Sequence, residues 1–263
     1  MQHAAARPPL ACALSAALAL TAAGCAGGER HGDRPTGTAP ASTRSPAALP
    51  SPAVPPVLTR GQARAALITE ADLGETWEPT RGFATWRDGV LKATAERADC
   101  RRLLDVLYTE ELFGSATAPR ATVALDDTAG GAQLHYRVTS HRAADIDRTL
   151  AWLGTLPDTC GHFTARSARG AVRDVRVTAV PLPEPGDARQ GLRVTVSGPA
   201  DAGGADTADA VLTVDLAAVR VGDDAISLTH GTLGEPVDDA TRTAAEVGAG
   251  RLAEVRRQGR AQV

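Results

Sequence analysis

The 263-residue sequence carries 28 lysine and arginine residues against 31 aspartate and glutamate residues, a formal net charge of −3 at pH 7. The arginines are scattered and are not interleaved with aromatic residues, so no concentrated basic face is present and nucleic acid is excluded as a partner. Aromatic residues make up only 3% of the chain, so leucine, valine, isoleucine and alanine must supply the core of any folded part.

The first 25 residues have the pattern of a bacterial lipoprotein signal. Arg7 gives a basic start, an Ala/Leu-rich run extends from Leu10 to Ala22, and small residues directly precede Cys25. Small side chains let a signal peptidase approach the backbone, and the cysteine thiolate accepts the lipid. The alternatives are an ordinary secretory signal with a chance cysteine or a short membrane helix, although the apolar run is shorter than the ~20 residues that span a bilayer. We predict a signal peptide at 1–24 and a lipid on Cys25 that anchors an extracytoplasmic protein to the outer face of the cell membrane.

Two regions follow the signal. Residues 25–57 consist mainly of Pro, Ala, Ser, Thr and Gly, which bury too little apolar surface to offset their ordering entropy, so we expect a disordered tether. At ~3 Å per residue it would reach up to about 100 Å from its anchor. Residues 58–263 have the length of a single domain. Lys92 is the only lysine, and this preference for arginine, with abundant alanine, is associated with GC-rich actinobacterial genomes.

The four cysteines have different expected fates. Cys12 leaves with the signal peptide and Cys25 takes the lipid, which leaves Cys100 and Cys160. In an oxidising compartment a disulfide between them is the expected state. The alternatives are two free thiols or a metal site that includes His162, but no further ligand near Cys100 fits the spacing of zinc sites. We expect a disulfide and no metal.

Capping residues and apolar residues at three-to-four spacing predict five helical segments. They are a helix that begins at Thr59, a short turn at Thr69–Gly74, Asp99–Tyr108, Ala143–Leu156 ended by Pro157, and a helix from about Asp238 toward the C-terminus. The third places Cys100 on its apolar face.

Alternation of apolar and polar residues predicts strands between these helices. They are Ala121–Leu125, Gln133–Val138, Cys160–Phe163, Val172–Val180, Leu192–Val196, Ala210–Leu216, Ala218–Val221 and Ala225–Thr229. Gly222 begins a tight turn between the last two. Because strands and helices do not alternate repeatedly along the chain, we predict an α+β fold, a single domain with a central antiparallel sheet and packed helices.

The sequence contains none of the standard nucleotide-binding, serine-hydrolase or zinc-protease motifs. The histidines of the folded part are His135, His141, His162 and His230, and the serines that could pair with them are Ser140, Ser167 and Ser227. No local motif supports such a pair. The acidic pairs at 126–127, 223–224 and 238–239 fall at turns or a helix start, where aspartate caps backbone amides. We expect no cofactor and no catalytic residues, and we interpret the loop 198–208 as a surface loop.

The arrangement resembles a known family. The lipoprotein signal, the Pro/Thr-rich tether, the run Leu67–Gly74 followed by Trp77, the helix with Ala98-Asp99-Cys100 and the helix ending Leu156–Cys160 are similar to the extracellular sensor-type domain of mycobacterial serine/threonine kinases of the PknH type. The resemblance implies an α+β domain with a cleft for an unidentified ligand, and it supplies no catalytic residues. The kinase member carries two disulfides, whereas this chain can form one.

The leading expectation is therefore a membrane-anchored domain that binds a ligand or partner in the cell envelope. The alternatives are a cell-envelope hydrolase and an envelope scaffold that contacts other proteins. Trp152 lies off the apolar stripe of its helix, and His135 and Arg137 share one face of their strand. We predict that these three residues line a cleft for an amphipathic envelope molecule with an acidic head group. The competing interpretation is that Trp152 is core and Arg137 is solvated.

Overall fold

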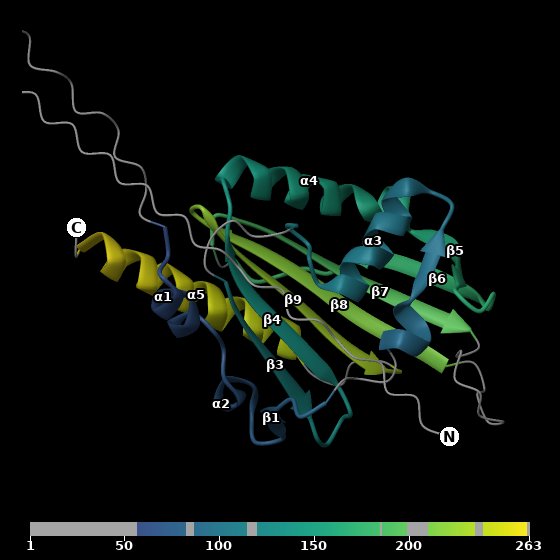
Figure 1. The fold of residues 1–263 in the computed structure, drawn as a ribbon, viewed down its shortest axis with the longest axis horizontal. Coiled ribbons are helices and arrows are strands. Elements are labelled where there is room, and N and C mark those ends of the chain that lie inside the picture. Colours follow the sequence, from purple (N-terminus) through teal and green to yellow (C-terminus); the bar gives the residue numbers. More distant parts are fainter. Residues whose placement is uncertain are drawn as a thin grey trace, which may run out of the picture. The chain divides into compact units, whose positions relative to one another are not determined.

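The computed structural model describes residues 57–82, 87–114, 120–184, 186–198, 210–234 and 239–261. The signal peptide, Cys25 and nearly all of the predicted tether lie outside this range, as does most of the loop 198–208. Within the described residues the fold class is confirmed, because a single antiparallel sheet packs against helices on both faces (Figure 1).

The sheet has nine strands in the order β1-β3-β4-β9-β8-β7-β6-β5-β2, and every neighbouring pair runs antiparallel. The strands are β1 (Trp77–Pro79), β2 (Ala93–Ala95), β3 (Ala121–Asp127), β4 (Gln133–Ser140), β5 (His162–Ser167), β6 (Val172–Ala179), β7 (Ala188–Gly198), β8 (Ala210–Val221) and β9 (Asp224–Leu233). The short strands at the two edges, β1 and β2, were not predicted.

The helices form a layer on each face of the sheet (Figure 1). They are α1 (Arg60–Ala65), α2 (Glu70–Leu73), a turn of π-helix η1 (Arg87–Leu91), α3 (Ala98–Thr109), α4 (Ala143–Thr159) and α5 (Ala240–Ala261). On one face α4 packs over β6, β7 and β8, with α3 beside it, and on the other α5 packs over β8 and β9 with α1 and α2 against it. Each layer has its own buried apolar cluster, so the sheet separates two cores.

Strand β8 corrects the prediction of two separate strands. It runs without a break from Ala210 to Val221, through Ala217, where we predicted an interruption. Leu216 and Ala218 point into the core under α3 and α4, whereas Ala217 and Val219 point into the core under α5. A strand covered on both faces loses the apolar–polar alternation that marks a half-exposed strand, and this loss produced the apparent break.

Helix α4 also differs from the prediction, because Pro157 lies inside it and does not end it. Proline removes one hydrogen bond of the helix ladder, but Leu153 and Leu156 are fully buried and hold the last turn on the core. Cys160, 0% exposed, caps the helix and forms the predicted disulfide with Cys100, at a Cα–Cα distance of 5.6 Å. The strand therefore begins at His162, after the disulfide, and not at Cys160.

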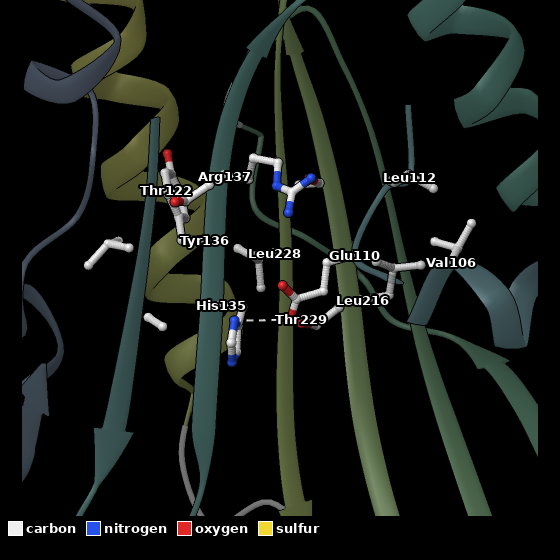
Figure 2. Close-up of a pocket in the computed structure, with 13 residues that line it drawn as sticks. Val106, Glu110, Leu112, Thr122, His135, Tyr136, Arg137, Leu216, Leu228 and Thr229 are labelled. Atoms are coloured by element: carbon white, nitrogen blue, oxygen red, sulfur yellow. Dashed lines mark ion pairs between the residues drawn. The ribbon is translucent and has the colours of Figure 1, made fainter. Parts of the chain in front are cut away.

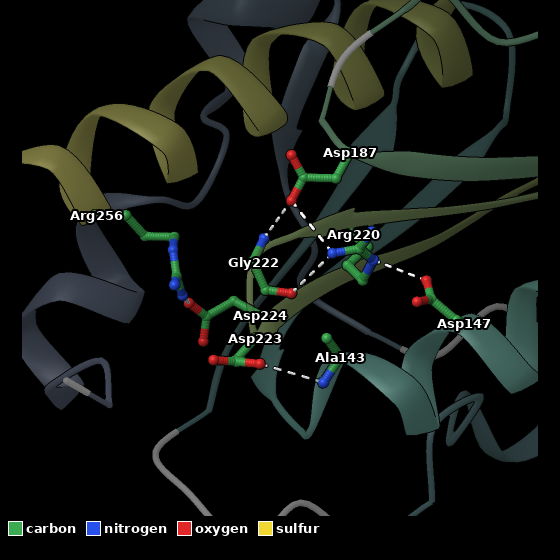
Figure 3. Close-up of polar contacts among 8 residues, drawn as sticks. All are labelled: Ala143, Asp147, Asp187, Arg220, Gly222, Asp223, Asp224 and Arg256. Carbon is green, nitrogen blue, oxygen red and sulfur yellow. Dashed lines mark hydrogen bonds and ion pairs between the residues drawn. The ribbon is translucent and has the colours of Figure 1, made fainter. Parts of the chain in front are cut away.

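The turn between β8 and β9 connects both helical layers (Figure 3). A carboxylate oxygen of Asp223 accepts a hydrogen bond from the backbone N–H of Ala143, at the start of α4, at 3.2 Å. The neighbouring Asp224 is buried and pairs with Arg256 of α5. Two consecutive acidic residues of one hairpin thus bind α4 and α5 on opposite faces of the sheet.

Arg220 extends these contacts along the same sheet end. Its guanidinium reaches Asp147 of α4 at 2.7 Å and Asp187 at 3.3 Å, and Asp187 also accepts the backbone N–H of Gly222 (Figure 3). Each acidic residue at this hairpin has a structural partner, as we expected for aspartates in turns.

Candidate functional site

A pocket of about 160 Å³ lies on the α3/α4 face of the sheet, above β4 and β9 (Figure 2). The end of α3 and the residues after it form one wall, with Val106, Glu110 and Leu112. The other lining residues come from β3, β4, β8 and β9 and are Thr122, Val123, Ala124, His135, Tyr136, Arg137, Leu216, Ser227, Leu228 and Thr229.

The hollow follows from side-chain size and from the position of the helices. Helix α4 covers β6, β7 and β8, and the pocket lies where its cover ends. On this face β9 presents the small side chains of Ser227 and Thr229, opposite Arg137 and His135 of β4. Short side chains beneath an incomplete helical layer leave space, and the apolar side chains at its wall are those expected of a small-molecule site.

Glu110 enters the pocket from an unusual backbone position. It is the C-cap of α3 and has φ = 60°, the only positive φ at a non-glycine residue in the described part of the chain. The left-handed conformation costs a residue with a Cβ about 1–2 kcal/mol. Residues held in this way cluster at functional sites, and here the conformation directs the carboxylate of Glu110 onto His135.

His135 lies between two oxygen acceptors. Its Nδ1 is 3.0 Å from Oε1 of Glu110, and its Nε2 is 2.7 Å from Oε1 of Gln133. The Gln133 amide, in turn, donates from Nε2 to Oδ1 of Asp126 at 2.7 Å. Because a carboxylate accepts and does not donate, Asp126 orients this amide so that its carbonyl oxygen faces the imidazole.

This arrangement engages both nitrogens of the imidazole ring. A neutral ring has one N–H and one bare nitrogen, so it can donate to only one of its two acceptors. Only an imidazolium could donate to both Glu110 and Gln133, and its pair with Glu110 would then be charge-assisted. Neither nitrogen is left to deprotonate a nearby hydroxyl such as that of Ser227.

Arg137 lies two residues further along β4 and on the same face (Figure 2). Its strand neighbours are Thr122 on β3 and Ser227 on β9. Its side chain is partly buried, and its guanidinium makes no hydrogen bond or ion pair with another described residue. A guanidinium that is partly removed from water without a counter-ion is a ready partner for an anion.

The structure brings together two of the three predicted site residues. His135 and Arg137 both line the pocket, but Trp152 lies elsewhere, on α4. Its indole N–H donates to Asp99 at 3.1 Å and its ring lies under the guanidinium of Arg102, 3.7 Å from the ring centroid. Trp152 therefore joins α4 to α3, and the wall of the pocket is α3 and not α4.

The other histidines and serines serve local contacts. His162 pairs with Asp174 across β5 and β6, and His230 contacts Thr241 of α5. Burial lowers the pKa of His141, and the negative charges of Asp145 and Asp224 offset part of that shift. Two of the serines are engaged as well: Ser140 donates to Asp224, and Ser167 accepts the N–H of Ala171. No cluster of three metal-ligating side chains occurs among the described residues.

Glu110 is the site residue that the sequence did not reveal. It stands 25 positions before His135, at the end of a helix whose acidic and polar residues gave no motif. Helices commonly end in glycine or asparagine. The presence of two consecutive glutamates, Glu110 and Glu111, at this helix end is the one feature of the sequence that could have indicated a special role.

No protein-family model matches the sequence, and no curated protein matches it. Among solved structures, the chain is similar to the extracellular domain of PknH from Mycobacterium tuberculosis, with a TM-score of 0.46 and 10% identity, over 78% of this chain and 100% of that one. Similarity at this level leaves the residues of the pocket to be interpreted from their own contacts. No helix in the described ranges is both long and apolar enough to cross a membrane.

Proposed function

We propose that this chain is an extracytoplasmic lipoprotein whose α+β domain binds an amphipathic molecule with an acidic head group. The lipid on Cys25 would hold it at the outer face of the cell membrane, and residues 25–57 would act as its tether. The pocket between the end of α3 and strands β4 and β9 would take the ligand.

The disulfide supports the location. Cys100 and Cys160 join two helices of the same core and are fully buried. Disulfides of this structural kind form and persist in oxidising compartments, which agrees with a secretory signal at 1–24. The small residues Ala22, Ala23 and Gly24, directly before Cys25, favour lipid attachment over simple cleavage.

Arg137 carries the proposal about the ligand. This partly buried cation has no anionic partner in the described residues and lines the same pocket as the apolar side chains of Val106 and Leu216. An acidic head group would satisfy the guanidinium, and an apolar chain would cover the leucine and valine side chains. The engagement of both imidazole nitrogens of His135 favours binding over hydrolysis at this site.

Native mass spectrometry of the full-length protein extracted from membranes tests both parts. We expect an acyl mass on the wild type that is absent from Cys25→Ser, together with recovery of that variant outside the membrane fraction. We also expect an anionic amphiphile bound to the wild type and depleted at least about tenfold in Arg137→Gln, the change for the loss of one charge-assisted contact of roughly 1.5–3 kcal/mol.

The matched control is Arg64→Gln, because Arg64 is an exposed arginine on α1, on the other side of the sheet. It should retain the ligand at the wild-type level. A ligand equally retained by Arg137→Gln, or a wild type without acyl mass that stays in the membrane fraction, would contradict the corresponding half of the proposal.

A further inference from the structure

We propose that the ligand of this pocket is a short, single-chain carboxylic acid, whose carboxylate is bound by Arg137 and Ser227 and whose chain runs toward β8 and the end of α3. The inference rests on the proposed function, because it concerns the same pocket. It goes further by naming the head group, a second residue that binds it, and the size and direction of the chain.

Ser227 is the serine of this region without a structural contact. Its residue is 7% exposed and lines the pocket, and its hydroxyl makes no hydrogen bond with another described residue. Ser140 and Ser167, in contrast, both have partners. A buried hydroxyl without a partner is unfavourable unless a ligand or an ordered water satisfies it. Ser227 is therefore available to a molecule that enters the pocket.

Ser227 and Arg137 face the pocket from adjacent strands. They are direct partners in the register of β9 and β4, which places their Cβ atoms about 4.5–5.5 Å apart. Figure 2 shows the guanidinium of Arg137 extending from β4 toward β9, the strand that carries Ser227. A guanidinium offers two parallel N–H donors on one edge, and the serine hydroxyl adds a third donor. Together these groups can bind one oxyanion.

Charge, shape and size favour a carboxylate as that oxyanion. The single positive charge of Arg137 matches a monoanion, whereas a phosphate monoester carries about −1.5 to −2 at pH 7. The planar fork of a guanidinium pairs with both oxygens of a carboxylate. The pocket, at about 160 Å³, is smaller than the sites of about 300–1,000 Å³ that hold drug-sized ligands. A carboxylate is smaller than a sulfonate or a phosphate and leaves more of this space to the chain.

The apolar part of the lining gives the direction of the chain. Leu216 lies on β8, the strand beyond β9, and Val106 and Leu112 come from α3 and the residues after it. From β4 to β8 the lining thus changes from a cation through a hydroxyl to apolar side chains. A chain that follows this order buries its methylene groups, and each buried methylene lowers the Kd about fourfold.

Calorimetry with probes of equal chain length tests the head group. Hexanoate, hexanesulfonate, hexyl phosphate and hexanol are titrated at pH 7.5 into the mature full-length protein, held in phosphatidylcholine nanodiscs. We expect hexanoate to bind most tightly. Hexanesulfonate or hexyl phosphate that binds as tightly as hexanoate would overturn the carboxylate assignment and leave the proposed function standing.

Butanoate tests the chain, because it has the same head group and two methylenes fewer. It should bind more than about tenfold more weakly than hexanoate. Equal affinities would show that the chain is not buried against the apolar wall, and this part of the inference would be wrong.

Two serines supply matched variants for the second head-group residue. Ser227→Ala should weaken hexanoate binding about tenfold, the change for one hydrogen bond to a charged group, and should change the Kd of hexanol less than about threefold. Ser197→Ala, on β7 and outside the lining, should bind both probes as the wild type does. Wild-type affinity of Ser227→Ala for hexanoate, or an equal loss for hexanoate and hexanol, would contradict a role of Ser227 at the head group.

Arg137→Gln separates this inference from the proposed function. It should lose hexanoate binding, because both rest on this guanidinium. A wild type that binds none of the three acids, or an Arg137→Gln variant that binds hexanoate as the wild type does, would overturn both.

A free acid and a carboxylate carried by a membrane lipid present the same group to Arg137 and Ser227. Nanodiscs that contain phosphatidylserine distinguish these sources, with phosphatidylglycerol as the anionic control without a carboxylate. Weaker hexanoate binding in phosphatidylserine alone would identify the lipid as the competing ligand and overturn the short free chain. Equal affinity in both would support a free acid.

Discussion

Glu110 combines backbone strain and site chemistry in a single residue. Its positive φ is one that glycine adopts without steric cost, yet a glycine would leave His135 without its carboxylate. The chain therefore carries an unfavourable conformation at the one position from which an acidic side chain reaches the imidazole. Backbone strain is found most often at functional sites, and its presence at a charged residue of the pocket agrees with that tendency.

Two variants of Glu110 separate these contributions. Glu110→Gly and Glu110→Gln both remove the charge, but only the glycine relieves the left-handed backbone. We expect Glu110→Gly to be more stable than Glu110→Gln by about 1 kcal/mol, measured by urea denaturation at pH 7. Equal stabilities would show that the conformation at this C-cap carries no strain.

At the residue scale, the sequence predicted the part of the site that lies on one strand. The two-residue period of a strand placed His135 and Arg137 on one face, and both line the pocket. Glu110 could not be found in this way, because its approach to His135 depends on the path of α3 over the sheet. Trp152 was correctly placed off the apolar stripe of α4, but that side of the helix meets Arg102 and Asp99 of α3.

At the scale of elements, contact between α5 and β4 depends on a glycine. A Cβ at Gly248 would lie 2.0 Å from the hydroxyl oxygen of Tyr136, a fully buried side chain. Gly250, two residues along the same helix, has no atom within 4 Å of such a Cβ. The two positions thus test packing and helix propensity separately.

We expect opposite effects of the same substitution at these two glycines. Gly248→Ala should destabilise the protein by about 1–3 kcal/mol, because Tyr136 has to move within a packed core. Gly250→Ala should stabilise it by up to about 1 kcal/mol, the difference in helix propensity. Thermal and urea unfolding of both variants would measure this, and a Gly248→Ala protein as stable as the wild type would contradict the close packing of Tyr136.

Helix α2 is joined to α5 by an ion pair with a defined pH dependence. Arg251 binds both carboxylate oxygens of Asp72, at 2.6 and 2.7 Å. Burial alone would raise the pKa of Asp72, but hydrogen bonds from Arg251 and Thr69 outweigh it and lower the pKa below 3.8. Because the folded-state pKa is lowered, the pair stabilises the fold above the unfolded-state pKa, and this stability is lost as the pH falls through the lower, folded-state value.

Asp72→Asn should therefore lose up to about 1 kcal/mol at pH 7, the usual range for a pair that is not fully buried. Its difference from the wild type should shrink as the pH is lowered below about 4. Urea denaturation at a series of pH values would follow this change. Glu75→Gln, an exposed neighbour, serves as the control, and a deficit of Asp72→Asn that stays constant down to pH 2 would be incompatible with the lowered pKa.

The elements themselves were predictable to different degrees. In half-exposed strands such as β6, apolar and polar residues alternate, so the sequence predicts them correctly. Strand β8 is buried on both faces, and the alternation disappears at Ala217, where the sequence wrongly predicts a break. Local sequence predicts that the helix ends at Pro157, but the burial of Leu153 and Leu156 in the core carries α4 past it. Edge strands of three residues, β1 and β2, are too short to show a period.

At the scale of the whole molecule, two sets of contacts fix the positions of the helices. At one end, Asp223 and Asp224 of the β8–β9 turn contact α4 and α5 on opposite faces. Within the α3/α4 layer, the disulfide joins Cys100 near the start of α3 to Cys160 at the end of α4. The wall of the pocket is the far end of α3, so the position of Glu110 depends on how firmly this layer is fixed.

The disulfide should account for a large share of the stability. It closes a loop of 60 residues, for which the chain-entropy model gives about 4 kcal/mol, and removal of such a bond typically costs 2–5 kcal/mol. We expect Cys100→Ala and Cys160→Ala to lose similar amounts in urea denaturation. Because both break the same cross-link, the double variant should lose little more than either one alone, a strong departure from additivity. Single variants with wild-type stability, or a double variant that loses the sum of both, would show that the two cysteines contribute by packing and not by the bond between them.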